Sequence, residues 1–201
     1  MIRSATKEDG QAIARLVLVI LKDMELPILE EVSEEQMIDL LAEATAYPTY
    51  RYGYQRILVY EHAGEVAGIA VGYPAEDEKI IDEPLREVFK KHGLAEDVRL
   101  FIEEETLPNE WYLDTISVDE RFRGMGIGSK LLDALPEVAK ASGKQALGLN
   151  VDFDNPGARK LYASKGFKDV TTMTISGHLY NHMQKRSVKI EVGTEAFNSE
   201  K

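Results

Sequence analysis

Three glycines at alternate positions, Gly124, Gly126 and Gly128 in the stretch RFRGMGIGSKLL, most constrain how this chain can fold. They follow a strand-like run and open an apolar run with helical spacing. At such a junction the backbone N–H groups and the helix dipole favour an anion. Because glycine lacks Cβ, a bulky phosphate can approach the backbone closely. The stretch predicts a phosphate site, with a glycine-rich turn packed tightly against a strand as the alternative.

The spacing of the glycines excludes two common phosphate sites. An ATP-binding loop needs lysine directly after its last glycine, whereas Gly128 is followed by Ser129 and then Lys130. A nicotinamide-dinucleotide loop, G-x-G-x-x-G counted from Gly124, would need glycine where Ser129 stands. The pattern that remains is R-x-x-G-x-G, running from Arg123 to Gly128.

Hydrophobic periodicity predicts strands with helices on both sides of them. A hairpin is expected at 56–62 and 65–74, because Ala63-Gly64 between these runs is suited to a tight turn. The other strands are expected at 2–4, 110–118 and 145–153 and on both sides of Gly177, and helices are expected from Thr6 or Asp9, from Ser33, from Ser129 and from Asn155. This order predicts an α/β fold with a mixed sheet rather than a repeating βαβ array.

Several segments depart from this simple pattern. Residues 75–110 interrupt the strands with two weaker helical runs, DEPLREVFKKHG and DVRLFIEEET. Pro136 predicts a kink or an early end in the helix expected over 129–141. Residues 186–201 are expected to form a strand at VKIEV and a loose tail. Without a linker or a repeat, we expect one domain over residues 1–185.

Composition narrows the function classes. The 201 residues carry a formal net charge of -11, which disfavours a nucleic-acid partner and suits either solubility or a cationic small molecule. The chain has no cysteine, which excludes a thiolate zinc site and a cysteine nucleophile. The N-terminus is polar, and no apolar run approaches the roughly 20 residues that span a bilayer. We therefore expect a cytoplasmic protein without a membrane partner.

A second motif identifies the phosphate. The stretch NPGARKLYASKGF, residues 155–167, resembles the N-x-x-A-x-x-L-Y-x-x-x-G-F motif that follows the glycine loop in the GNAT superfamily of acyl-CoA-dependent N-acyltransferases. With IRSATKED and LDTISVDERFRGMGIGSKLL, the resemblance covers most of residues 1–185 and leaves out the insertion at 75–110. It implies a GNAT fold, in which helices flank a mixed sheet of about seven strands.

The resemblance also implies where acetyl-CoA binds. Ile116 and Val118 match strand positions that hydrogen-bond the pantetheine arm through main-chain groups. The loop amides would hold the pyrophosphate, and the matching residues are Arg123, Gly124, Gly126, Ile127, Gly128 and Ser129. Asn155 matches a residue that contacts the cofactor arm, although it could also cap the helix that Pro156 begins.

The catalytic residues follow the family only in part. Tyr162 matches the tyrosine near the thioester sulfur, where a phenol can protonate the departing thiolate. The positions that commonly hold a glutamate base carry Tyr112 and Asn150 instead. Alternation would place Asp114 on one strand face with Tyr112, Ile116 and Val118, so Asp114 is the first candidate to relay a proton. A buried structural role for Asp114, a base among Glu103–Glu105, and a water chain remain open.

The acceptor is less defined than the cofactor. His178, Tyr180 and His182 share a strand face and could contribute to an amine pocket, and no metal site is expected. The tyrosines at 47, 50, 52 and 54 could bind an amine by cation–π contact or simply pack at the rim of the sheet. We expect direct acetyl transfer to a primary amine of a small molecule, by a homodimer. The alternatives are a catalytically weak CoA-binding regulatory module and an acetyltransferase for protein N-termini or lysines.

Overall fold

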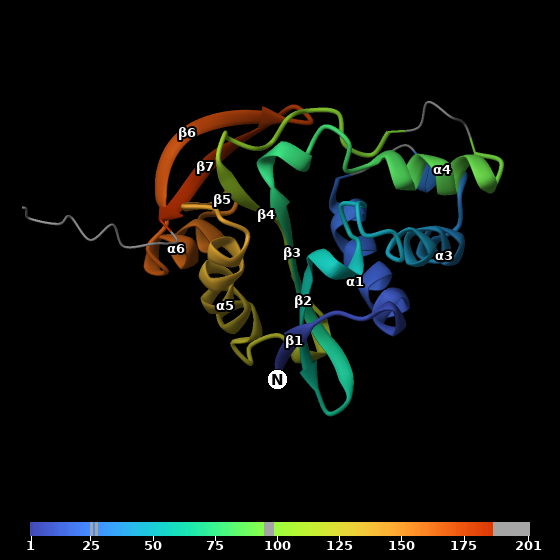
Figure 1. Ribbon diagram of the computed structural model, residues 1–201, viewed down its shortest axis with the longest axis horizontal. Coiled ribbons are helices and arrows are strands. Elements are labelled where there is room, and N and C mark those ends of the chain that lie inside the picture. Colours follow the sequence, from blue (N-terminus) through green and yellow to red (C-terminus); the bar gives the residue numbers. More distant parts are fainter. Residues whose placement is uncertain (25, 27, 95–98, 187–201) are drawn as a thin grey trace, which may run out of the picture.

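The computed structural model describes residues 1–24, 26, 28–94 and 99–186, and it contains a seven-stranded mixed sheet with helices on both faces (Figure 1). The strand order is β1-β2-β3-β4-β5-β7-β6. The strands are β1 (Ile2–Ser4), β2 (Ile57–His62), β3 (Glu65–Pro74), β4 (Glu110–Val118), β5 (Ala146–Asp152), β6 (Lys168–Ile175) and β7 (His178–Arg186). The expected α/β sheet of about seven strands is confirmed.

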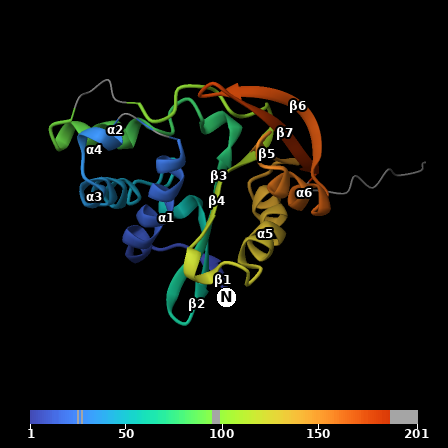
Figure 2. The same cartoon turned by 180° about the vertical axis from the view of Figure 1, so that it is seen from behind.

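The helices divide between the two faces of the sheet. In both Figure 1 and the reverse view of Figure 2, α5 and α6 lie on one side and α1, α3 and α4 on the other. Their bounds are α1 (Gly10–Asp23), α2 (Ile28–Glu31), α3 (Glu34–Ala44), α4 (Glu83–Lys91), α5 (Ile127–Ala141) and α6 (Pro156–Ser164). Each helical layer buries its own apolar core against the sheet. This is expected for amphipathic helices, which carry their apolar side chains on the face that packs on the sheet.

Local sequence signals account for most element boundaries. Asp9 accepts the backbone N–H of Thr6 at 2.7 Å and so stabilises the turn before α1. Ser33 Oγ accepts the N–H of Gln36 at the start of α3. In the β2–β3 hairpin, Ala63 and Gly64 have φ of 51° and 82°, which is the geometry of the tight turn that the sequence predicts.

The structure corrects two expected helical features. Of the second helical run in the insertion, DVRLFIEEET, the described residues 99–106 form no helix. Leu100 is buried in the core beside α1 and α4, and Glu78 accepts hydrogen bonds from Glu105 N–H and Thr106 Oγ1 at the end of the segment, so tertiary contacts hold these residues. Pro136 does not end α5 early, since the helix continues to Ala141, and the alternative of a kink stays a prediction. The strand expected at VKIEV and the tail lie outside the described residues.

Two irregularities in β4 shape the middle of the sheet. Pairing of β3 with β4 passes from Val71–Thr115 to Gly72–Leu113, so Asp114 is the extra residue of a β-bulge. Parallel pairing of β4 with β5 covers Glu110–Leu113 and stops there. From Asp114 onward, therefore, the edge of β4 that faces β5 is unpaired, and the sheet opens between the two strands.

The bulge overturns the expected face alternation in β4. Ile116 and Val118 pack against the core beneath α5, whereas Tyr112 contacts Tyr73 and Ile81 on the opposite side. Asp114 lies on the side of Tyr112, where its carboxylate meets Arg51. One extra residue shifts the two-residue period, so these four side chains do not share a face.

Candidate functional site

The glycine loop connects β4 to α5 and leaves its backbone accessible. Gly124 and Gly126 have φ of 80° and 71°, a left-handed conformation that other residues rarely adopt. A Cβ added at either position would meet no atom within 4 Å, so the space above the loop is open. Gly128 lies in the first turn of α5, where a Cβ would make ordinary contact with Val118.

The loop amides are free to bind an anion. In the part of the chain that the structure describes, no main-chain N–H from Gly124 to Ser129 donates to a backbone carbonyl, and the ladder of α5 begins with Lys130 donating to Gly126. These donors converge at a helix N-terminus, where a negative charge is favoured. Arg123 immediately precedes them. The geometry fits the phosphate site that the sequence predicts.

Helix α6 presents Asn155 and Tyr162 after β5. Asn155 Oδ1 accepts the N–H of Ala158 at 3.0 Å, so this side chain caps the helix. Tyr162 is half-buried against the α5 core, with its ring 6.0 Å from that of Phe167 in an edge-to-face contact. Burial raises the pKa of the Tyr162 phenol, which keeps it protonated at neutral pH. Its hydroxyl makes no hydrogen bond with any described residue, so the proton is available for transfer.

On the opposite face, Asp114 is held by a buried arginine. Arg51 and Asp114 have side chains that are 2% and 4% exposed, and Arg51 Nη1 lies 2.5 Å from Asp114 Oδ1. Tyr73 Oη is 3.4 Å from the same oxygen, and Thr115 Oγ1 donates to Oδ2 at 2.8 Å. Both carboxylate oxygens of Asp114 therefore already have partners.

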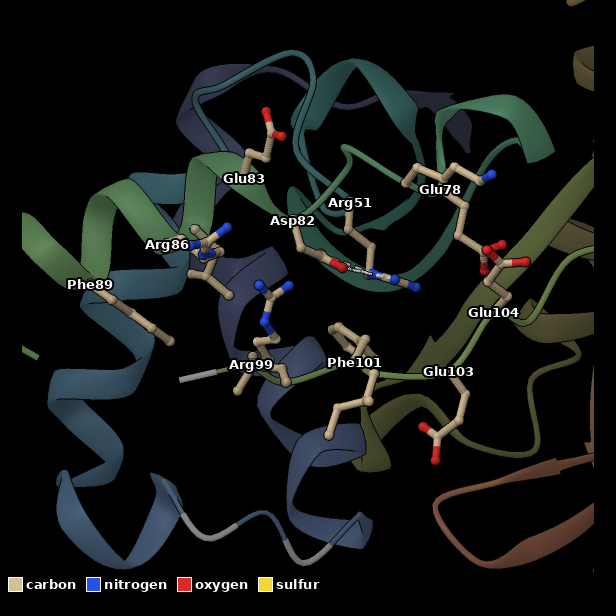
Figure 3. Close-up of a pocket in the computed structure, with 14 residues that line it drawn as sticks. Arg51, Glu78, Asp82, Glu83, Arg86, Phe89, Arg99, Phe101, Glu103 and Glu104 are labelled. Atoms are coloured by element: carbon tan, nitrogen blue, oxygen red, sulfur yellow. Dashed lines mark hydrogen bonds and ion pairs between the residues drawn. The ribbon is translucent and has the colours of Figure 1, made fainter. Parts of the chain in front are cut away.

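Arg51 also connects β4 to the insertion. Its guanidinium binds Asp82 through Nε and Nη2, as the dashed lines in Figure 3 mark, and lies 4.0 Å from the centroid of the Phe101 ring. Asp82 immediately precedes α4, and Phe101 belongs to the extended segment 99–106. One charged group thus joins the bulge of β4 to two separate parts of the insertion.

Glu105 is one of the three consecutive glutamates, Glu103–Glu105, that the sequence indicates as alternative bases. The Tyr112 hydroxyl donates to Glu105 Oε2 at 2.8 Å, while Oε1 has no hydrogen-bond partner among the described residues. The backbone N–H of Glu105 is fixed by Glu78 Oε1 at 2.7 Å. Burial and the negative charge of Asp114 raise the pKa of Glu105 to about 7. Its neighbours Glu103 and Glu104 are exposed.

A cavity of about 420 Å³ brings Glu105 and Asp114 together beside the opening in the sheet, whereas Arg51 and Tyr162 do not line it. The end of α1, the segment 99–106, strands β4 and β5, and the β6–β7 turn all contribute to its wall. The lining residues are Ile20, Asp23, Met24, Tyr52, Phe101, Glu105, Tyr112, Asp114, Thr115, Asn150, Asp152, Ile175, Ser176, His178 and Tyr180.

The candidates for the acceptor pocket are only partly brought together. His178 and Tyr180 line the cavity, but His182 is fully buried behind it. Of the four clustered tyrosines, Tyr52 reaches the cavity, whereas Tyr50 is enclosed in the core. Within the described ranges, no group of three or more His, Cys, Asp or Glu side chains could hold a metal ion, and no helix is long and apolar enough to cross a membrane.

Comparison with known proteins decides the family. Residues 18–167 match the sequence model of the Acetyltransferase (GNAT) family. This chain belongs to the GNAT family. The description of that family is of acetyltransferases.

Solved structures agree with the family assignment. A crystal structure of an acetyltransferase is 98% identical and covers 94% of this chain and 100% of its own, with a TM-score of 0.90. An N-acetyltransferase from Staphylococcus aureus Mu50 is 32% identical and covers 92% and 100%, with a TM-score of 0.79. YncA of Salmonella typhimurium, solved with its cofactor acetyl-CoA, shares the fold at 20% identity, 94% coverage of both chains and a TM-score of 0.57.

Curated relatives match over shorter regions. The [Ribosomal protein bS18]-alanine N-acetyltransferase of Haemophilus ducreyi is 40% identical over 67 residues, which are 33% of this chain and 46% of that protein. The chain spans less than half the length of the curated relatives it matches.

The buried ion pair yields a stability prediction. Replacing Arg51 with methionine keeps an unbranched side chain but leaves Asp114 and Asp82 without their cation. Breaking a buried pair from one side costs about 3–5 kcal/mol, so we expect the free energy of unfolding to fall by that amount in urea titrations. Arg159→Met, which breaks an exposed pair with Asp169, is the matched control and should leave the free energy of unfolding close to its wild-type value. Equal losses in the two variants would contradict the role given to Arg51.

Proposed function

We propose that this GNAT enzyme transfers an acetyl group from acetyl-CoA directly to the primary amine of a small molecule, with Glu105 as the proton acceptor. One observation carries the proposal: a carboxylate with a pKa of about 7 and a free oxygen lines a cavity beside the opening between β4 and β5. A base is most effective when its pKa lies near the working pH.

The residues that would hold acetyl-CoA surround that opening. The free amides of the glycine loop and Arg123 suit the pyrophosphate, and the unpaired edge of β4 offers the main chain of Ile116 and Val118 to the pantetheine arm. Asn155 lies between the end of β5 and the start of α6. Its Oδ1 already accepts the N–H of Ala158 as the helix cap. When bound, acetyl-CoA supplies an activated acetyl group as a thioester.

The chain's own side chains move the protons. Glu105 takes a proton from the incoming ammonium group, which frees the nitrogen lone pair for attack on the thioester carbonyl. Tyr162 gives its phenolic proton to the sulfur as the carbon–sulfur bond breaks, and it recovers a proton from the new amide nitrogen. We assign the acceptor role to Glu105 rather than Asp114, because both oxygens of Asp114 are engaged by Arg51 and Thr115.

The cavity favours a small cationic acceptor. A volume of about 420 Å³ lies within the range of small-molecule sites. The β6–β7 turn is tied to the insertion by a hydrogen bond from Ser176 N–H to Glu103 Oε1 at 3.1 Å, which narrows access from that side. Asp23 and Asp152 line the cavity beside Glu105 and favour positive charge.

An acceptor panel tests the reaction and the acceptor class together. Release of free CoA thiol should be measured with a polyamine, an amino acid, an aminoglycoside and a peptide that begins with alanine. We expect acetyl-CoA turnover with at least one small amine and slower turnover with the peptide. Preference for the peptide, whose chemistry resembles that of the Haemophilus ducreyi relative's substrate, would contradict the small-acceptor assignment, and absence of turnover with every amine would contradict the transfer itself.

The pH dependence of kcat/KM tests the role of Glu105. Because Glu105 must be ionised to take the proton, kcat/KM for the amine should rise about tenfold per pH unit below about pH 7 and then level off. Glu105→Gln should be roughly 100-fold slower below that pH, and its kcat/KM should keep rising toward the pKa of the amine itself.

The neighbouring Glu104→Gln is the matched control, since it makes the same chemical change on an exposed side chain. It should keep the wild-type profile. A Glu105→Gln enzyme that still levels off near pH 7 would show that another group accepts the proton.

A further inference from the structure

Two ionisable side chains beneath the cavity have no part in the reaction described above. Glu110 is the first residue of β4 and His182 lies on β7, and both are 0% exposed. His182 Nε2 lies 3.0 Å from Glu110 Oε2. Gly148 makes room for this contact, because a Cβ there would lie 2.0 Å from Glu110 Oε2.

Glu110 is fixed on its other sides as well. Its Oε1 accepts the backbone N–H of Leu107 at 2.8 Å, and its Oε2 accepts from Gln184 Nε2 at 2.7 Å. The ring of His182 is therefore held by a carboxylate that cannot turn away without losing two further hydrogen bonds.

Asn150 connects His182 to the reactive carboxylate, and its contacts set the direction of the hydrogen bonds from His182 Nδ1 to Glu105. Its Nδ2 faces the backbone carbonyl of Glu105 at 2.9 Å, and a carbonyl can only accept, so the amide nitrogen must be on this side. The same Nδ2 donates to Tyr112 Oη at 3.1 Å. The amide oxygen then faces His182 Nδ1 at 2.7 Å, which must carry a hydrogen.

These directions decide where the Tyr112 hydrogen points. Since Tyr112 Oη accepts from Asn150, its own hydrogen is left to donate to Glu105 Oε2 at 2.8 Å. The ring of Tyr112 also stacks on that of His182, with the centroids 6.3 Å apart. The chain of contacts thus runs from Glu110 through His182, Asn150 and Tyr112 to Glu105.

We propose that His182, anchored by Glu110, is a positioning residue that holds the Asn150 amide in one orientation and thereby directs the Tyr112 hydroxyl at Glu105. The inference rests on the proposed function in that Glu105 is the proton acceptor there. Without the Nδ1 donor, the Glu105 carbonyl is the only one of these two partners left to orient the Asn150 amide, so the Tyr112 hydroxyl supports the ionised form of Glu105 less strongly.

The other groups that face Glu105 act on it independently of His182. The charged groups are Arg51, Glu78 and Asp114, and the phenols apart from Tyr112 are Tyr73 and Tyr180. His178 lines the same cavity. Substitutions at position 182 leave all of these in place, so a change in the titration of Glu105 reports on the hydrogen-bond chain.

Two substitutions of one side chain separate its two hydrogen bonds. In His182→Asn, the amide nitrogen takes the place of Nδ1 and keeps the donor to Asn150. In His182→Gln, the longer amide reaches Glu110 in place of Nε2 and loses that donor. Both remove the ring, so the packing change is shared.

The readout is the titration of the Glu105 carboxyl by ¹³C NMR without substrates, assigned with Glu105→Gln. We expect the Glu105 midpoint to rise by about one pH unit in His182→Gln and to stay near the wild-type value in His182→Asn. An unchanged midpoint in His182→Gln, or an equal rise in both variants, would overturn the proposal. If neither variant folds, Asn150→Leu should produce the same rise, and an unchanged midpoint there would overturn it too.

The kinetic profile of the same variants separates this inference from the proposed function. If the NMR midpoint shifts in His182→Gln and the midpoint of the kcat/KM profile shifts with it, the positioning role of His182 and the role of Glu105 as proton acceptor both stand. If the NMR midpoint shifts while the kinetic profile does not, His182 positions Glu105 as inferred, and the assignment of Glu105 as proton acceptor is overturned.

Discussion

The guanidinium of Arg51 is the group on which the site depends. It is almost fully buried and is shared by Asp114, the extra residue of the β4 bulge, and by Asp82 at the start of α4. Phe101 packs against its plane. Removing either the cation or a carboxylate would leave an uncompensated charge in the interior. The ion pairs therefore hold the bulge and the insertion together.

Burial is the main cause that raises the pKa of Glu105, and the same ion pair modifies it. The negative charge of Asp114 raises the pKa of Glu105 and the positive charge of Arg51 lowers it, in a setting where burial favours the protonated acid. The carboxylate that we propose as proton acceptor comes from the insertion rather than from the strands. Tyr112 and Asn150, which stand at the strand positions of the usual glutamates, both hydrogen-bond to Glu105.

The fold was predictable from sequence because its signals are local. The hairpin turn at Ala63-Gly64, the caps at Ser33 and Asn155, and the glycine loop each require only neighbouring residues. The site was less predictable because it depends on distant contacts. No neighbouring residue distinguishes Glu105 from Glu103 and Glu104 in the sequence. The bulge places Asp114 and Ile116 on different faces of the sheet, and the order of apolar and polar residues in β4 does not predict it.

Chemical rescue tests the central claim, that Glu105 accepts the proton, most directly. Glu105→Ala removes the carboxylate and leaves space beside Tyr112, so added formate can occupy it and take the proton in its place. We predict that formate restores acetyl transfer to a small amine in Glu105→Ala with saturable dependence, while wild type and Glu105→Gln do not respond. A folded Glu105→Ala enzyme that binds acetyl-CoA and is not accelerated by formate would contradict the account.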